Sequence, residues 1–362
     1  MIRPEAEAEL AEVIAAAEGP LAIQGGGTRG VALDGAALST AGLSGVTLYE
    51  PGALTLVAQA GTPVAEIERV LEGEGQRLAF EPMDHRALLG TTGDPTIGGV
   101  IAANVSGPRR VQVGAARDFA LGVRYVDGTG QVIKNGGRVM KNVTGYDLVK
   151  LLSGSWGSLG VLSEVSLKVL PVPETEATLT LSVASPETAV AAMSAAFGSP
   201  YDVTGAAWAQ GAVSIRLEGF APSLAYRAER LTQALATYGE ITLLEAEDSA
   251  ARWAEIRDVE AFANMQGDVW RVSVKPSDGP AVIAAAGQGT AMLDWGGGLV
   301  WLCLPEGTDL RAALTGIAGH AQLVRGRGFP RFQPEPPEVA ALSTALRAKF
   351  DPRGILNPGV MG

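Results

Sequence analysis

Three glycine-rich stretches hold the residues best suited to binding a ligand. The first is Gly25-Gly26-Gly27-Thr28-Arg29-Gly30, which follows a strand expected at residues 21–24. Successive N–H groups in such a loop can form a concave nest for phosphate oxygens. The string also fits G-x-G-x-x-G, but a nicotinamide-dinucleotide site needs a helix directly after the glycines. Residues 31–35 do not indicate a long helix, which leaves a phosphate nest or an ordinary tight turn.

The second stretch runs from Gly93 to Gly107 and consists almost entirely of small residues. Without large side chains, backbone atoms can approach a flat, polar ring system closely and bond to its carbonyls and ring nitrogens. Thr96, Asn104 and Ser106 add short side chains that form hydrogen bonds. The alternative is an ordinary glycine-rich loop leading into a buried helix.

The third stretch reads Gly136-Gly137-Arg138-Val139-Met140-Lys141-Asn142-Val143-Thr144-Gly145-Tyr146-Asp147 and is followed by a second glycine-rich run at residues 154–164. By pattern alone it is a loop, a short helix, a loop and a strand. Lys141 on its own is compatible with a solvated surface lysine.

The composition excludes several other kinds of site. The 362 residues carry a net charge of −11, which disfavours nucleic acid because phosphate contacts need clustered Lys and Arg. The single cysteine, Cys303, allows no disulfide within the chain and no cysteine-ligated iron–sulfur cluster. With only His85 and His320, a zinc site is not expected. We expect no metal, no signal peptide, no membrane-spanning helix and a cytoplasmic location.

The elements that must position these stretches follow from periodicity and turn residues. We expect helices at 5–18, 63–71 and 146–152 and strands at 21–24, 46–50, 54–60, 76–80, 119–126, 131–134 and 160–170. After Pro171-Val172-Pro173, strands at 178–183, 212–218, 268–275 and 299–304 alternate with helices at 186–197 and 222–238. This pattern predicts an α+β domain with a largely antiparallel sheet. A linker at 334–337 and a helix at 338–349 complete the expected order.

Taken in order, these stretches resemble the FAD-binding domain of the vanillyl-alcohol-oxidase / p-cresol-methylhydroxylase (PCMH) superfamily. The resemblance covers about residues 20–172 and the C-terminal Phe350-Asp351-Pro352 and Asn357-Pro358-Gly359. The run from Val139 to Asp147 is similar to the short FAD-binding subunits (E subunits) of bacterial glycolate oxidases. The resemblance implies a PCMH-type FAD-binding domain at 1–173, an α+β cap or substrate-side domain at 174–333, and a segment at 334–362 that returns to the first domain.

The resemblance also implies roles for individual residues. The backbone N–H groups of Gly25, Gly26, Gly27 and Thr28 would hold the pyrophosphate. Asn357 would approach the flavin, or would only terminate the last helix. Gly114 and Asp118 would shape the loop beside the flavin, and Gly160 and Val161 would contact the adenine end. The residues implied to line the ribityl chain and the ring are Pro82, Gly93, Asp94, Thr96, Gly98, Gly99, Ala102, Asn104 and Gly107.

The chain departs from many relatives at two points. Thr28 and Arg29 stand where relatives carry a histidine that bonds FAD covalently, so we expect noncovalent FAD. The late histidine-rich motif of substrate-oxidising relatives is missing, and we take His85 and His320 as structural. No general base is assigned. Arg109, Arg110 and Arg117 could clamp a carboxylate, although adjacent loop arginines are more typical of surface charge or of flavin-phosphate partners.

The resulting hypothesis is an FAD-binding subunit of a glycolate dehydrogenase (oxidase) complex that oxidises glycolate to glyoxylate. The resemblance implies a larger flavin subunit and an iron–sulfur subunit as partners, with membrane contact only through them. Two alternatives stay open. One is a stand-alone FAD-dependent dehydrogenase of a 2-hydroxy acid, and the other is a non-catalytic flavin-relay or assembly subunit.

Overall fold

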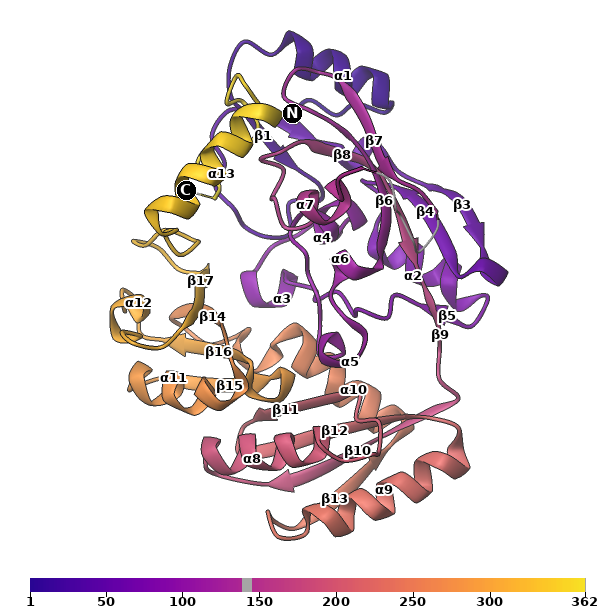
Figure 1. Cartoon of the computed structure of the whole chain (residues 1–362), viewed down its shortest axis with the longest axis vertical. Helices are drawn as coiled ribbons and strands as arrows, with labels where there is room; N and C mark the ends of the chain where they lie inside the picture. Colours follow the sequence, from indigo (N-terminus) through magenta and orange to yellow (C-terminus); the bar gives the residue numbers. More distant parts are fainter. Residues whose placement is uncertain (139–144, 362) are drawn as a thin grey trace. The chain divides into compact units, whose positions relative to one another are not determined.

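The computed structural model describes residues 1–138 and 145–361. Its backbone divides into two compact units (Figure 1). The first contains Met1–Ser106, Gly114–Val172 and Pro334–Gly362, and the second contains Gly107–Val113 and Pro173–Gln333. The chain therefore enters the second unit twice. The short segment Gly107–Val113 is joined at both ends to residues of the first unit.

The first unit is built around a five-stranded antiparallel sheet in the order β3-β4-β8-β6-β7. Two short pairs accompany it, β1 with β2 in parallel and β5 with β9 antiparallel. The strand bounds are β1 Leu21–Gln24, β2 Ala36–Ser39, β3 Val46–Glu50, β4 Thr55–Gln59, β5 Gln76–Arg77, β6 Ala120–Val126, β7 Val132–Gly136, β8 Val161–Lys168 and β9 Leu170–Pro171.

Short helices connect and cover these strands. Their bounds are α1 Glu7–Ala16, α2 Val64–Glu72, α3 Arg86–Leu89, α4 Ile97–Ala102, α6 Ala116–Phe119, α7 Leu148–Leu152 and α13 Pro337–Phe350. Two of them begin where the sequence provides a start signal. Pro63 precedes α2, and the Asp147 carboxylate accepts a hydrogen bond from the Lys150 N–H at the start of α7.

The C-terminal segment completes the core of the first unit. Leu10 and Ile14 of α1 are fully buried and share a cluster with Ile355 and Leu356. The Leu21 N–H donates to the Ile355 carbonyl at 2.8 Å. In Figure 1 the yellow C-terminal segment accordingly lies beside the indigo start of the chain. Residues more than 300 positions apart in the sequence therefore share one hydrophobic core.

The second unit is an eight-stranded sheet in the order β13-β10-β12-β11-β15-β16-β14-β17, and every pairing is antiparallel. Its strands are β10 Thr175–Ser182, β11 Gly205–Ala209, β12 Ala212–Gly219, β13 Ile241–Glu245, β14 Asp268–Val274, β15 Thr290–Asp294, β16 Leu299–Leu304 and β17 Gly319–Arg325. Its helices are α5 Arg110–Val113, α8 Pro186–Phe197, α9 Ala221–Leu235, α10 Ala246–Asp258, α11 Gly279–Ala286 and α12 Leu310–Ala313.

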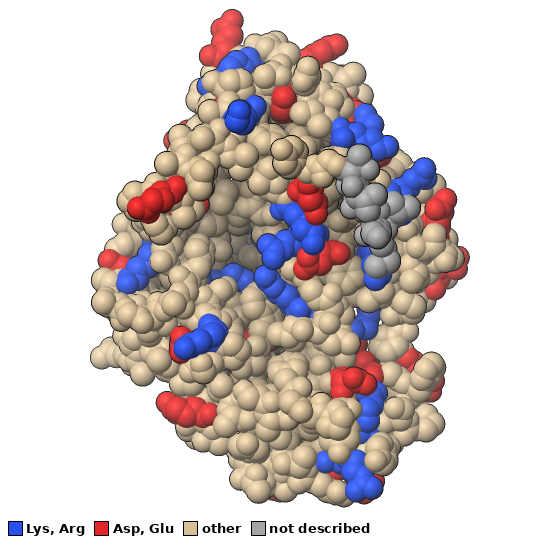
Figure 2. Space-filling view, viewed as in Figure 1, with Lys and Arg blue, Asp and Glu red and all other residues tan. Residues whose placement is uncertain are grey.

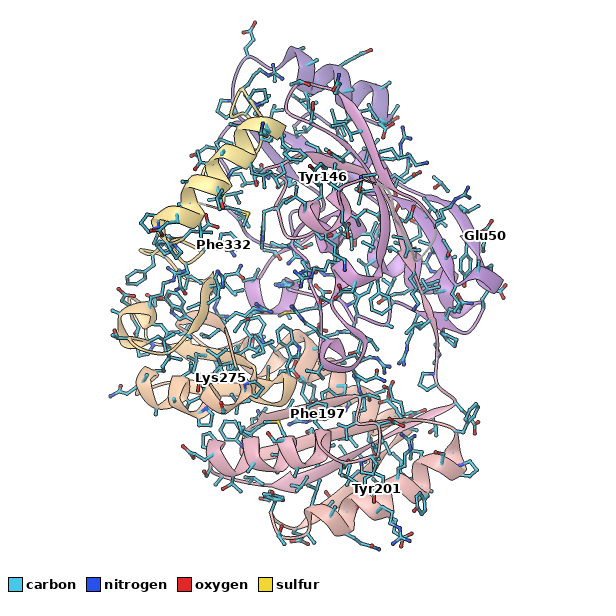
Figure 3. All side chains as sticks on the ribbon, in the orientation of Figure 1. Glu50, Tyr146, Phe197, Tyr201, Lys275 and Phe332 are labelled. Carbon is cyan, nitrogen blue, oxygen red and sulfur yellow. The ribbon has the colours of Figure 1, made fainter. Side chains whose placement is uncertain are left out.

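The two faces of this sheet differ in polarity. One face carries the larger hydrophobic core, with Leu179, Ile215 and Trp270 fully buried. Helices α8, α9 and α11 pack on the strands that supply it, and Phe197 and Tyr201, labelled in Figure 3, pack against it from loop and helix ends. Alternate residues of the same strands, such as Arg216 and Arg271, therefore point to the opposite face, where they lie among buried apolar side chains such as Trp301.

The predicted α+β class and the largely antiparallel second sheet are confirmed. Most predicted elements are present, with ends shifted by a few residues. The strand expected at 76–80 is paired only over Gln76–Arg77, since Leu78, Ala79 and Phe80 are buried without joining a sheet. Strands β2, β11, β13, β15 and β17 and helices α3, α5, α6, α10, α11 and α12 were not predicted. Within the described residues, no helix combines the length and the apolar character needed to cross a membrane.

One polar contact ties α1 to the five-stranded sheet. The Glu7 carboxylate accepts hydrogen bonds from the Arg124 guanidinium of β6 and, at 2.5 Å, from the Ser163 hydroxyl of β8. The hydrogen bond from Arg124 is the main reason why the pKa of Glu7 lies below its usual 4.5. A carboxyl whose pKa is lowered by folding stabilises the folded state above its unfolded pKa, and this contribution is lost as the pH falls through the lowered value.

We therefore predict that Glu7→Gln lowers the free energy of unfolding at pH 7 by about 1 kcal/mol, because the pair is partly exposed. The difference from the wild type should shrink below about pH 4. Urea unfolding at several pH values measures both effects. Glu12→Gln, an exposed carboxyl on the same helix, is the control and should change little. An equal loss in both variants would contradict the assigned role of the Arg124 contact.

Candidate functional site

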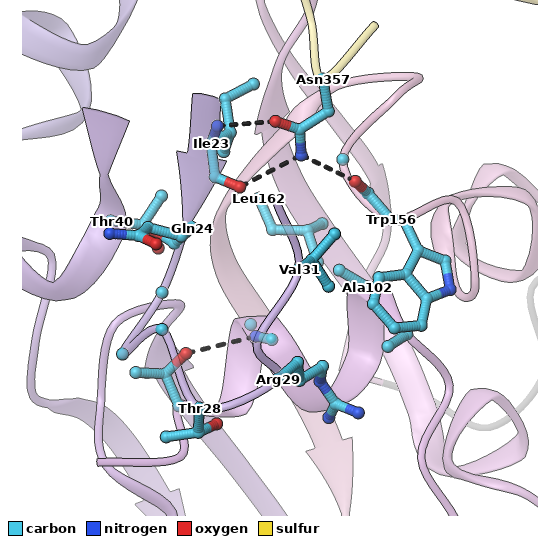
Figure 4. A pocket seen from close by; sticks show the side chains of 18 of the residues that line it. Ile23, Gln24, Thr28, Arg29, Val31, Thr40, Ala102, Trp156, Leu162 and Asn357 are labelled. Carbon is cyan, nitrogen blue, oxygen red and sulfur yellow. Dashed lines mark hydrogen bonds between the residues drawn. The ribbon is translucent and has the colours of Figure 1, made fainter. Parts of the chain in front are cut away.

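A pocket in the first unit is lined by four parts of the chain and by Thr40 (Figure 4). Residues 23–33 form one wall, residues 95–103 form a second and residues 156–162 form a third, and Asn357 and Val360 close it from the C-terminal segment. Three of the four parts are the glycine-rich stretches or their immediate continuations. The wall is consequently made mostly of backbone and small side chains.

The first glycine loop presents backbone donors to this pocket. Among the described residues, none accepts a hydrogen bond from the backbone N–H of Gly25, Gly26, Gly27 or Thr28. The loop is held from outside instead, since the Ser39 hydroxyl donates to the Gly25 carbonyl and the Thr91 hydroxyl donates to the Thr28 carbonyl. Open N–H groups on a fixed loop fit the oxygens of a pyrophosphate. No helix follows the loop; residues 31–35 are extended or turn, as the sequence predicted.

Two glycines allow the walls to meet at backbone contact. A Cβ on Gly26 would lie 1.8 Å from the Asp94 carbonyl oxygen, and one on Gly98 would lie 2.6 Å from the Ala60 Cβ. Both distances are far below any real contact of a side chain. Gly26 therefore lets the first wall approach the start of the second, and Gly98 lets the second wall pack against Ala60, which follows β4.

Asn357 joins the C-terminal segment to two other walls (Figure 4). Its Oδ1 accepts from the Ile23 N–H at 2.6 Å, and its Nδ2 donates to the carbonyls of Ile23 at 3.1 Å and Trp156 at 2.9 Å. The residue is 4% exposed and its backbone is left-handed at φ 44°, a conformation asparagine tolerates better than most residues. Its amide thus fixes the pocket walls.

Arg29 supplies positive charge beside the glycine loop. Its guanidinium lies 5.6 Å from the centre of the Trp156 ring, a cation–π distance, and its Nη1 is 3.5 Å from the His85 Nε2. His85 also lies 3.2 Å from the Met83 carbonyl through Nδ1. His85 is therefore part of the surroundings of Arg29. Within the part of the chain that the structure describes, the residues lining the pocket include no His, Cys or Tyr.

The structure brings most of the sequence-predicted site residues into this one pocket. Those that line it are Gly25, Gly26, Gly27, Thr28, Thr96, Gly98, Gly99, Ala102, Gly160, Val161 and Asn357. Gly93 and Asp94 lie directly behind the wall, against Gly26.

The remaining predicted residues lie elsewhere. Pro82 is buried outside the lining. Asn104 accepts from the Arg117 N–H at 3.0 Å, and Asp118 accepts from the Ala115 N–H at 2.9 Å beside Gly114. Gly107 belongs to the second unit, where its carbonyl accepts from the Trp295 indole at 3.0 Å.

Several lining residues were not predicted as site residues. They are Ile23, Gln24, Arg29, Gly30, Val31, Leu33, Thr40, Pro95, Val100, Ala103, Trp156, Gly157, Leu162 and Val360. The clearest sequence signal was at Trp156-Gly157, which lies in the same glycine-rich run as Gly160. Val139 to Thr144, including Lys141, lie outside the described residues.

The arginines considered as carboxylate clamps have different surroundings. Arg109 is 4% exposed and forms an ion pair with Glu218, so its interpretation as surface charge is wrong. Arg110 lies 4.5 Å from the centre of the Trp295 ring in the second unit. Arg117 is exposed and lies 4.0 Å from Asp118, which is also paired with Lys150 at 3.2 Å. Figure 2 shows such basic and acidic side chains together over α6 and α7.

Comparison with known proteins gives three findings. The family described as FAD binding domain matches residues 1–136. The glycolate oxidase subunit GlcE of Escherichia coli (strain K12) is 34% identical over 348 residues, which are 94% of this chain and 92% of that protein. The glycolate oxidase subunit GlcD of Bacillus subtilis (strain 168) is 37% identical, but only over 35% of this chain and 25% of GlcD.

Among solved structures, an alkyldihydroxyacetonephosphate synthase superposes with a TM-score of 0.72. It covers 98% of this chain and 75% of the synthase at 16% identity, which shows a shared fold and nothing more. The open amides of Gly25 to Thr28 fit the pyrophosphate of a dinucleotide, in agreement with the matched family. The near full-length similarity to GlcE decides the assignment: the chain belongs to the family of glycolate oxidase subunit GlcE, within the PCMH-type FAD-binding superfamily, and its cofactor is FAD.

Proposed function

We propose that the chain is the FAD-binding subunit of a glycolate dehydrogenase (oxidase) complex that oxidises glycolate to glyoxylate. The similarity to GlcE along nearly the whole of both chains is the observation that carries this proposal. The pocket of the first unit supports it by offering a site for FAD. The proposed place in glycolate catabolism follows from the same reaction.

The chain's own residues would hold the cofactor in three parts. The N–H groups of Gly25 to Thr28 would bind the pyrophosphate. Thr96, Gly98, Gly99 and Ala102 would lie along the ribityl chain and ring, while Gly160 and Val161 would contact the adenine end. Asn357 would act by positioning, since its amide already bonds to Ile23 and Trp156. Pro82, Gly93, Asp94, Asn104, Gly114 and Asp118 would support this site from outside its lining. The flavin contact that the resemblance implies for Gly107 stays a prediction.

The reaction takes a hydride from the carbon and a proton from the hydroxyl of glycolate. FAD, when bound, supplies the two-electron acceptor, and a protein group has to accept the proton. Among the described residues, those that line the pocket include no carboxylate and no imidazole. This favours a second candidate in which the chain relays electrons and the proton acceptor belongs to a partner subunit.

The proposed partners are a larger flavin subunit and an iron–sulfur subunit. A single cysteine cannot ligate an iron–sulfur cluster. An iron–sulfur cluster that accepts electrons from the flavin would therefore have to be on another chain. Any membrane contact would be made through these partners, and a cytoplasmic location remains a prediction from the sequence.

The close approach at Gly26 gives the first test of the FAD site. Gly26→Ala should abolish FAD retention, because the new Cβ would force the first glycine loop away from Asp94. The measurement is the ratio of flavin to protein absorbance after gel filtration. Gly52→Ala is the matched control, since nothing lies within 4 Å of a Cβ there. Normal FAD retention in Gly26→Ala would place the cofactor elsewhere.

The chemistry of the lining gives a second test. With Thr28 and Arg29 at the usual attachment position and no His, Cys or Tyr in the lining, we expect acid or heat denaturation to release all FAD. Filtration of the denatured protein should leave the yellow colour in the filtrate. Flavin that stays with the precipitated chain would show a covalent bond and overturn the noncovalent assignment.

The third test separates the candidate functions. The FAD-loaded chain, purified alone, should show flavin absorption bands at about 370 and 450 nm. Anaerobic addition of glycolate should bleach them if the chain oxidises glycolate itself. Bands that persist until the partner subunits are added would support the relay function. Bands that persist even in the complete complex would contradict glycolate oxidation.

A further inference from the structure

The face of the eight-stranded sheet opposite its larger hydrophobic core carries an arginine beside aromatic rings. Arg271 of β14 pairs directly with Trp301 of β16 on one side and with Gln322 of β17 on the other. Ser273, two residues along β14, pairs with His320. Directly paired residues in antiparallel strands point to the same face. Arg271, Ser273, Trp301, His320 and Gln322 therefore form one contiguous surface.

Arg271 lies between aromatic rings and has no close carboxylate. Its guanidinium is 5.1 Å from the centre of the Trp295 ring and 6.0 Å from that of Trp301. Its one hydrogen bond to a described side chain is a long one, 3.5 Å, to the Ser273 hydroxyl. Among the described residues no Asp or Glu oxygen lies within 4.0 Å of it. A partly buried arginine is usually paired with an anion.

A second cation shares the same indole. Arg110 lies 4.5 Å from the centre of the Trp295 ring, and the hydrogen bond from Trp295 to the Gly107 carbonyl fixes the ring against the segment that carries Arg110. Burial and the neighbouring charge of Arg110 lower the pKa of Arg271 to about 10. Arg271 is still charged at neutral pH, and an anion bound to its guanidinium would offset the repulsion from Arg110.

The other groups on this surface leave the net charge positive. Asp294 is the carboxylate that acts on Arg271, and its Oδ1 already accepts from the Trp295 N–H at 2.6 Å. Loss of hydration, with the charges of Arg271 and Arg311, lowers the pKa of His320, which keeps the imidazole neutral at pH 7. Ser273 and Gln322 add neutral hydrogen-bonding groups.

We propose that Arg271, with Ser273 and Gln322 beside it and Trp301 as a flat wall, binds the carboxylate of a small 2-hydroxy acid. The planar guanidinium matches a carboxylate with two parallel hydrogen bonds. The anion site follows from the arrangement of charges, while the choice of a 2-hydroxy acid rests on the proposed function. The chain would then carry a substrate site of its own, outside the FAD pocket lining.

The chain connects this surface to the proposed flavin residues. The segment Gly107–Val113, which supplies Arg110 and holds Trp295, is preceded by Asn104 and followed by Gly114 and Asp118. These are residues that the resemblance assigns to the surroundings of the flavin.

The test uses the full FAD-loaded chain and oxalate, a two-carbon carboxylate that cannot be oxidised as an alcohol. Titration calorimetry at pH 7 should show oxalate binding to the wild type that Arg271→Gln weakens at least about tenfold. Arg327→Gln removes an equal charge from an exposed position after β17 and should leave the affinity unchanged. Glycolamide, which lacks the carboxylate charge, should not bind measurably.

A second variant distinguishes loss of the anion site from misfolding of the chain. Arg271→Lys keeps the charge but loses the two-pronged geometry, so its affinity should lie between those of the wild type and Arg271→Gln. Flavin absorbance in each sample reports whether the chain is folded and loaded. No oxalate binding by the loaded wild type, or equal binding by Arg271→Gln, overturns the proposal.

The same samples separate this inference from the proposed function. In one outcome, oxalate binding depends on Arg271 but glycolate does not reduce the flavin of the chain or of the complex. This outcome would support the anion site and contradict glycolate oxidation. In the other outcome, glycolate reduces the flavin of Arg271→Gln at the wild-type rate and at the same half-reducing concentration. This outcome would support glycolate oxidation and contradict the anion site.

Discussion

The side-chain amide of Asn357 is the contact on which the cofactor pocket depends. It saturates both backbone groups of Ile23, at the end of the strand that leads into the glycine loop, and it also bonds to the Trp156 carbonyl. A buried amide with all its partners supplied is worth more than its separate hydrogen bonds, because removing it leaves several polar groups unsatisfied at once. The glycine loop can keep its N–H groups open because its base is fixed in this way.

Backbone contact then determines the shape of the pocket. A methyl group on Gly26 would push the first wall away from Asp94, and a methyl group on Gly98 would push the second wall away from Ala60. A pocket built from main chain presents rigid dipoles that need no reorganisation when an anionic ligand arrives. The large glycine content of the chain is thus concentrated, in part, where it creates a binding surface.

Local sequence predicted the loops of the pocket but not all of the contacts between distant segments. The glycine strings and their order indicated FAD, and the alternation in β8 and β16 indicated strands, since each depends on neighbouring residues. The sequence did not indicate that the segment after Gly107 belongs to the second unit, where Arg109 forms a buried ion pair with Glu218. Such a pair, 109 residues apart in the chain, leaves no periodic signal. The strands β11, β13, β15 and β17 were missed for a related reason, because their partners and not their own patterns define them.

The return of the C-terminal segment to β1 also has a consequence for biosynthesis. Ribosomes release a chain from its N-terminus onward, at roughly 5 to 20 residues per second. The glycine loop at residues 25–30 emerges early, but the wall that needs Asn357 cannot close until more than 300 further residues have been translated. Stable cofactor loading therefore has to wait until Asn357 has left the ribosome. A product truncated before Asn357 would lack the hydrogen bonds that this side chain makes to Ile23 and Trp156.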